Sequence, residues 1–130
     1  MPETRFTGAW KLIEQIEIRD GRETYPRGEH PVGLLIYLPD GTMSVQLMRP
    51  DRGQFTDLTH LQTALEEYLG YYGRYTVDEA GGVVVHHVEG SSYPRWIGTD
   101  QVRRYRFEGD HLILSAEGQG VRRVLTWARI

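Results

Sequence analysis

The chain of 130 residues has a net charge of −3, five histidines and no cysteine, and hydrophobic residues make up 39% of it. This length suits a single hydrophobic core, so we expect one domain over residues 1–130. The lack of cysteine excludes disulfides, thiolate zinc sites and thiol nucleophiles, and the negative charge disfavours nucleic acid and anionic membranes as partners.

The N-terminal residues lack the basic segment and apolar run of a secretory signal, and no stretch of the sequence is long enough to span a membrane. We therefore expect a cytoplasmic protein with neither a nucleic-acid nor a membrane partner.

The first part of the chain has the pattern of three β-strands. Residues 9–18 alternate in polarity, and Glu14 falls on the same face as the hydrophobic residues Trp10, Leu12, Ile16 and Ile18. Residues 33–38 form an apolar run of strand length, and Asp40-Gly41 then predicts a tight hairpin into a third strand over residues 42–49.

A change of period after this strand predicts a helix. Hydrophobic residues recur at helical spacing from Leu58 to Tyr72, and Gly70 lies near the expected end. We expect this helix to pack with its apolar side across one mouth of the fold.

Five more strands follow, separated by short turns. They are expected at residues 73–78, 83–89, 101–108, 111–116 and 121–130. The short connections favour antiparallel pairing of neighbours, and eight strands are enough for a sheet to close on itself. The sequence predicts an all-β, eight-stranded up-and-down barrel with one helix between strands three and four; the rival architecture is an open sandwich.

Several segments carry a family resemblance. Gly8-Ala9-Trp10 resembles the Gly-x-Trp start of lipocalins, and the runs at 31–52, 70–79, 85–89 and 96–105 are similar to the lipocalin-like domain proteins of bacteria and fungi. The resemblance implies a calycin-type barrel with a cavity, in which the Trp closes one end beneath an Arg of the last strand. Arg123 and Arg129 are the candidates for that Arg.

Alternation places several charged groups inside such a barrel. Arg103 shares a face with Tyr105 and Phe107, Arg123 shares one with Trp127, and Glu14 lies on the Trp10 face. An enclosed charge is costly unless it is paired and hydrogen-bonded, so these groups should bind one another, water or a ligand.

Adjacent histidines at 86 and 87 must point to opposite faces, so they cannot bind one metal together, and we expect no metal site. Glu89 shares the face of His87, which makes His86 the candidate for the lumen. His86 is either a structural imidazole hydrogen-bonded in the core or a general acid or base.

Further polar and aromatic residues complete the predicted cavity. Tyr37, Gln46, Trp96 and Tyr105 are candidate ligand contacts beside Arg103 and Arg123. The face of strand three stays open, because Met43, Val45 and Leu47 could fill the lumen and leave Gln46 outside. Trp96 lies on a loop, where it either plugs the barrel end or covers a ligand.

Three functions fit this pattern. The first is a barrel that binds a small apolar molecule, aromatic or polyketide-like, in its lumen. The second is a cofactor-independent cyclase, isomerase or dehydratase of natural-product biosynthesis, in which His86 or Glu14 moves a proton and Arg103 or Gln46 stabilises negative charge. The third is a filled barrel that acts only as a structural or partner-binding module. No cofactor is expected, and a homodimer is left open.

Overall fold

The computed structural model describes residues 4–50 and 57–130. Its strands are β1 (Gly8–Arg19), β2 (Arg22–Thr24), β3 (Val32–Tyr37), β4 (Thr42–Met48), β5 (Tyr68–Asp78), β6 (Val83–Ser91), β7 (Asp100–Glu108), β8 (His111–Gly118) and β9 (Val121–Arg129). The helices are the short 3₁₀ turns η1 (Thr4–Phe6) and η2 (Pro94–Trp96) and the α-helix α1 (Leu58–Glu67). The predicted turn after β4 extends into residues 51–53, which lie outside the described residues.

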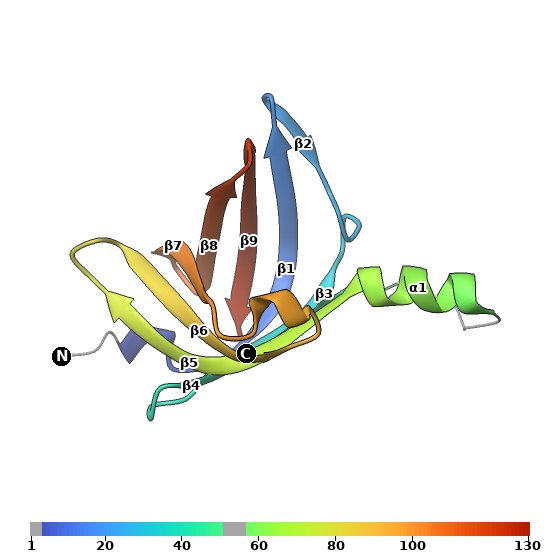
Figure 1. Cartoon of the computed structure of the whole chain (residues 1–130). Coiled ribbons are helices and arrows are strands. Elements are labelled where there is room, and N and C mark those ends of the chain that lie inside the picture. The colour runs from blue at the N-terminus through green and yellow to red at the C-terminus, as the bar shows by residue number, and fades with distance from the viewer. Residues whose placement is uncertain (1–3, 51–56) are drawn as a thin grey trace.

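The sheet closes into the predicted barrel. Neighbouring strands pair antiparallel in the order β1-β3-β4-β5-β6-β7-β8-β9, and β9 pairs back onto β1 from Trp10 opposite Arg129 to Arg19 opposite Val121. The additional strand β2 forms a hairpin with the far end of β1 (Figure 1). Because the first and last strands are hydrogen-bonded, the eight-stranded barrel is confirmed and the open sandwich is wrong.

The predicted hairpin at Asp40-Gly41 joins β3 to β4. Gly41 has a φ of +97°, a conformation that side chains disfavour, and the Leu38 amide donates to the Thr42 carbonyl at 2.8 Å. The Thr42 amide donates to Asp40 Oδ1 at 2.9 Å, so the turn residues themselves fix the register of the two strands.

The helix is confirmed between the third and fourth barrel strands, but it ends earlier than its pattern predicts. Tyr68 already begins β5, so Leu69 and Tyr72 belong to a strand. Figure 1 shows α1 running away from the barrel, and Leu58 and Leu61 are exposed. The expectation that α1 covers the barrel mouth is therefore wrong. Among the described residues, no helix is long and apolar enough to cross a membrane.

One end of the barrel is closed by aromatic residues. Phe6 of η1 is fully buried and packs edge-on against Tyr37, Tyr105 and Phe107, with ring centres 4.8–5.5 Å apart. The Trp10 indole donates to the Phe6 carbonyl at 2.9 Å. This aromatic floor leaves the opposite end of the lumen available as an entrance.

Arg129 is the arginine that covers Trp10. Its guanidinium carbon lies 4.1 Å from the centre of the Trp10 ring, and its Nη1 donates to the Thr7 carbonyl at 3.0 Å. The other candidate, Arg123, lies further back along β9, toward the opposite end. Arg129 therefore closes the barrel and Arg123 is free for another role.

An extra residue in β1 shifts the phase of the strand. Leu12 is opposite Trp127 and Glu14 is opposite Thr126, so Ile13 is unpaired in a β-bulge. Beyond the bulge Gln15 points inward and is 3% exposed. The prediction that Glu14 faces the lumen is wrong, because strict alternation does not hold across a bulge.

Gly73 lies at a second irregularity, where the pairing of β5 with β6 shifts by one residue. A Cβ atom at this position would overlap the carbonyl oxygen of His87, a backbone atom that cannot move aside. We expect Gly73→Ala to lower the free energy of unfolding by about 2 kcal/mol, since added volume in a packed site forces backbone shifts. Gly118→Ala is the control, because no atom lies within 4 Å of its added Cβ. Equal urea midpoints for the two variants would contradict this prediction.

Candidate functional site

The lumen contains a cavity of about 490 Å³ to which all eight barrel strands contribute. Its walls combine apolar and polar side chains, and the apolar ones include Leu35, Leu47, Leu114, Leu125 and Trp127. Polar groups are concentrated on β5, β6 and β7 at the inner end and on β1, β8 and β9 at the mouth. A small apolar molecule with a few polar groups suits such a site.

His86 is the central polar residue of the inner cavity. It is 2% exposed, as its place in the strand pattern predicts, and both ring nitrogens are hydrogen-bonded. Its Nε2 lies 2.6 Å from Tyr37 Oη and its Nδ1 lies 2.6 Å from Tyr71 Oη. Tyr71 lines the cavity beside His86, whereas Tyr37 lies beneath them in the floor.

Burial keeps these three residues uncharged. Burial, together with the smaller effect of the nearby positive charge of Arg103, lowers the pKa of His86 to about 3. Burial also raises the pKa of Tyr71, and the pKa of Tyr37 is raised well above its usual value by burial and by the neighbouring Tyr71. At neutral pH the network is therefore tyrosine, imidazole and tyrosine, without charge.

Counting protons fixes the direction of these hydrogen bonds. A neutral imidazole donates from one nitrogen and accepts at the other. Among the described residues His86 is the sole hydrogen-bond partner of Tyr37 Oη, so the buried Tyr37 hydroxyl donates to Nε2 rather than stay unpaired, which would cost about 1–3 kcal/mol. His86 then donates from Nδ1 to Tyr71, and the hydroxyl proton of Tyr71 is left to point into the cavity.

Arg103 lies beside Tyr71 and Trp96. Its guanidinium carbon is 5.9 Å from the centre of the Trp96 ring, its Nη1 donates to the Val102 carbonyl at 3.2 Å, and it also hydrogen-bonds Tyr71. Arg103 lines the cavity half-buried, as predicted. It therefore places a positive charge at the inner end of the lumen.

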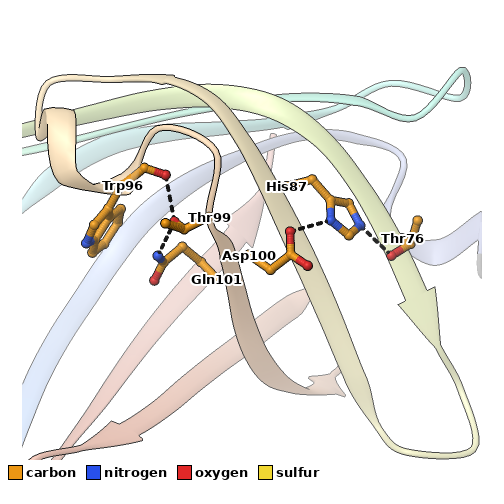
Figure 2. Close-up of polar contacts among 6 residues, drawn as sticks. All are labelled: Thr76, His87, Trp96, Thr99, Asp100 and Gln101. Atoms are coloured by element: carbon orange, nitrogen blue, oxygen red, sulfur yellow. Dashed lines mark hydrogen bonds and ion pairs between the residues drawn. The ribbon is translucent and has the colours of Figure 1, made fainter.

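The loop that carries Trp96 is held by its own polar contacts. Thr99 Oγ1 donates to the Trp96 carbonyl at 2.6 Å, and Gln101 Nε2 donates to Thr99 Oγ1 at 2.9 Å (Figure 2). The Trp96 ring packs edge-on against Tyr71 with ring centres 5.5 Å apart, and Trp96 lines the cavity. This loop, rather than α1, supplies an aromatic wall of the cavity beside Tyr71.

Two arginines lie at the mouth. Arg123 Nε is 3.3 Å from Glu17 Oε1, and both residues line the cavity. Arg123 lies on the inward face of β9, as predicted, but its side chain is 47% exposed, so the prediction that this charge is enclosed is wrong. Arg27, from the loop before β3, donates from Nη1 to Gln15 Oε1 at 3.1 Å. Burial lowers the pKa of Arg27, yet the group keeps its charge because an arginine starts far above neutral pH.

Two buried donors lack an acceptor among the described residues. They are Arg27 Nε and Trp127 Nε1, and both side chains line the cavity. Trp127 belongs to β9, which lies across the barrel from β5 in the order of the strands. The lumen thus offers donors on opposite walls, from Trp127 of β9 on one side and from Tyr71 of β5 on the other, with Arg103 of β7 on the wall between them.

Two further predicted contacts lie elsewhere. Gln46 is exposed on the outer face of β4, because Met43, Val45 and Leu47 occupy the inner face. The prediction that Gln46 contacts a ligand is therefore wrong. The alternative prediction, in which Met43, Val45 and Leu47 face the lumen, is correct. Tyr105 faces inward but packs 4.8 Å from Phe6 in the aromatic floor and does not line the cavity. Glu14 is absent from the lining because of the β1 bulge.

His87 lies on the outer face of β6. Thr76 Oγ1 is 2.9 Å from its Nε2 and Asp100 Oδ1 is 2.8 Å from its Nδ1, a chain across three strands that Figure 2 shows. A hydroxyl, an imidazole and a carboxylate follow one another here as they do in a nucleophilic triad. The Asp100 side chain is 63% exposed, however, and the nearby amides of residues 98 and 99 already donate to backbone carbonyls, so they do not form an oxyanion hole. We assign this cluster a structural role. The described residues contain no group of three His, Asp or Glu that could hold a metal.

Sequence reasoning missed Tyr71, Gln15 and Arg27. The helical pattern places Tyr71 near the end of the helix. A strand that begins at Tyr68 instead places the Tyr71 side chain on the inward face together with Leu69. Gln15 enters the lumen through the bulge, and Arg27 enters from a loop, where no periodicity indicates a direction.

Comparison with known proteins places the chain in a family and finds similar proteins and structures. The profile of a family described as "Lipocalin-like domain" matches residues 7–130. A 4'-hydroxy-3'-methoxypropiophenone carrier protein of Aspergillus oryzae (strain ATCC 42149 / RIB 40) is 39% identical over an alignment of 108 residues, and the match covers 68% of this chain and 96% of that protein. A mutant of the fluorescent protein UnaG has a similar structure, with 11% identity, a TM-score of 0.47 and coverage of 97% of this chain and 96% of the other.

Proposed function

Because the chain belongs to the lipocalin-like domain family, we propose that it is a carrier whose lumen binds a small aromatic ketone with a phenolic hydroxyl group and releases it unchanged. The observation that supports this most directly is the cavity of about 490 Å³, which has apolar side chains along its walls and hydrogen-bond donors on opposite sides. A compound with a hydroxyl at one end of an aromatic ring and a carbonyl at the other has an oxygen atom available for the donors on each side.

The similar carrier from Aspergillus oryzae supports the ligand class, since its name states a phenolic ketone. A role in natural-product biosynthesis and a cytoplasmic location are parts of this proposal. The compound of that name is also the probe of choice, because it combines an apolar ring and ethyl group with the two polar groups.

The chemistry of the lumen favours a carrier over an enzyme. The enzyme hypothesis requires His86 or Glu14 to transfer a proton, but Glu14 does not line the cavity. The pKa of His86 is about 3, so this imidazole is a poor base near neutral pH, where an effective general base needs a pKa near that of the solution.

The proposal is tested by titrating the protein with 4'-hydroxy-3'-methoxypropiophenone. We expect saturable quenching of tryptophan fluorescence, because Trp96 and Trp127 line the cavity, and full recovery of the compound by chromatography. Absence of saturable binding would overturn the carrier proposal, and conversion of the compound would favour the enzyme hypothesis instead.

Tyr71→Phe removes the hydroxyl that points into the cavity. We expect its affinity for this compound to fall about tenfold, the usual contribution of one neutral hydrogen bond. Tyr72→Phe is the matched control, since Tyr72 is 56% exposed on the opposite face and should bind as the wild type does. Equal affinities for the two variants, measured by calorimetry, would remove Tyr71 from the site.

A further inference from the structure

The charges that line the cavity do not balance. The lining includes the three arginines Arg27, Arg103 and Arg123 but only the two glutamates Glu17 and Glu117. Glu17 is paired with Arg123 at 3.3 Å. Glu117 lies 4.0 Å from Arg122, which is exposed. The inner end of the lumen therefore holds positive charge without a carboxylate.

Arg103 is the residue that holds this charge. Among the described residues it forms no ion pair, and its partners are a backbone carbonyl, the Trp96 ring and the Tyr71 hydroxyl. The nearby ionisable group on β6, His86, is neutral and accepts from Tyr37. An arginine cannot shed its proton, so the half-buried guanidinium of Arg103 needs water or an anion as a partner on its cavity side.

The hydrogen-bond directions at this end lead to the same requirement. Tyr71 Oη already accepts from His86 and hydrogen-bonds Arg103, so its own proton is free for an acceptor in the cavity. Arg103 offers further N–H donors beside it. A ligand group at this position must accept hydrogen bonds from the Tyr71 hydroxyl and the Arg103 guanidinium. A negative charge on that group strengthens both hydrogen bonds.

From this geometry we propose that the carrier binds its aromatic ligand in ionised form, as a phenolate whose oxygen lies between the Arg103 guanidinium and the Tyr71 hydroxyl. This inference rests on the proposed function and adds the charge state and the orientation of the ligand. One proton leaves the phenol for the solvent on binding, and the carbonyl end of the ligand is directed toward the β9 wall and Trp127.

Absorbance measures this directly, because a para-acyl phenolate absorbs at longer wavelength than the phenol. The probe is 4'-hydroxy-3'-methoxypropiophenone, titrated with pH in buffer and again in the presence of excess wild-type protein. We expect the midpoint of the bound compound to lie at least about one pH unit below that of the free compound, the effect of one adjacent opposite charge. An equal or higher midpoint overturns the proposal.

The methyl ether of the same compound separates this inference from the carrier proposal. It cannot ionise, so we expect it to bind at least about tenfold more weakly than the phenol at a pH where the bound phenol is ionised. Equally tight binding of both compounds overturns the ionised state and leaves the carrier intact. If neither compound quenches tryptophan fluorescence, the proposed function fails, and this inference fails with it.

Arg103→Gln should return the midpoint of the bound compound to that of the free one. Arg104→Gln, the neighbouring arginine on the exposed outer face of β7, should keep the lowered midpoint. A lowered midpoint in Arg103→Gln would assign the effect to another group. If that variant does not fold, the wild-type titration and the methyl ether still decide between the outcomes.

Discussion

Acidification from pH 7 to pH 4 is expected to lower the free energy of unfolding by about 3 kcal/mol through His86 alone. The folded protein holds this imidazole between two tyrosine hydroxyls with a pKa of about 3, whereas in the unfolded chain its pKa is near the ordinary histidine value of 6.5. Below the unfolded pKa the unfolded chain binds a proton that the folded chain excludes. The contribution of His86 is therefore complete above that value and is lost as the pH falls toward the folded pKa.

Other groups also titrate in this range, so variants isolate the contribution of His86. Urea unfolding at both pH values should show that His86→Gln loses less stability on acidification than the wild type does, by about the same 3 kcal/mol. His87→Gln is the matched control, because its side chain is 38% exposed on the outer face and hydrogen-bonded to Asp100. Identical pH dependence in the wild type and His86→Gln would show that His86 is not held neutral.

Arg103→Gln is expected to weaken binding of 4'-hydroxy-3'-methoxypropiophenone about a hundredfold. The variant removes a charge-assisted hydrogen bond to the ligand, which contributes about 1.5–3 kcal/mol, together with the positive charge of the inner cavity. Glutamine keeps a polar group of smaller volume, so the surrounding Trp96 and Tyr71 need little rearrangement.

Calorimetry on Arg103→Gln and Arg104→Gln provides the comparison. These neighbours alternate across β7, so Arg103 lines the cavity while Arg104 is exposed. Wild-type affinity in Arg104→Gln with a large loss in Arg103→Gln is the expected pair of results. Similar affinities in both variants would place the ligand away from β7.

The closed barrel could be predicted because most strands alternate regularly. The same alternation predicts that His86, Arg103 and Arg123 lie on inward faces, because the strand pairing has no irregularity at these residues. The Asp40-Gly41 turn fixed the register of its hairpin through contacts among neighbouring residues, which the sequence shows directly.

The errors arose where local pattern and tertiary structure disagree. The β1 bulge at Ile13 reverses the phase of the strand, and no residue type in that segment indicates it. The hydrophobic residues from Tyr68 to Tyr72 fit both a helical and a strand period, and pairing with β4 and β6 selects the strand. Arg27 depends on loop geometry, which periodicity does not describe.

The most direct test of a lumen that carries an aromatic ligand is the measurement of intermolecular NOEs between 4'-hydroxy-3'-methoxypropiophenone and the methyl groups of the protein. The ring protons should contact the inward methyl groups of Leu35, Leu47 and Leu114, which line the cavity. They should not contact Leu34 or Val102, which are 36% and 52% exposed on the outside of the barrel. Contacts confined to these outer methyl groups, or none to either set at saturating compound, would contradict the carrier function.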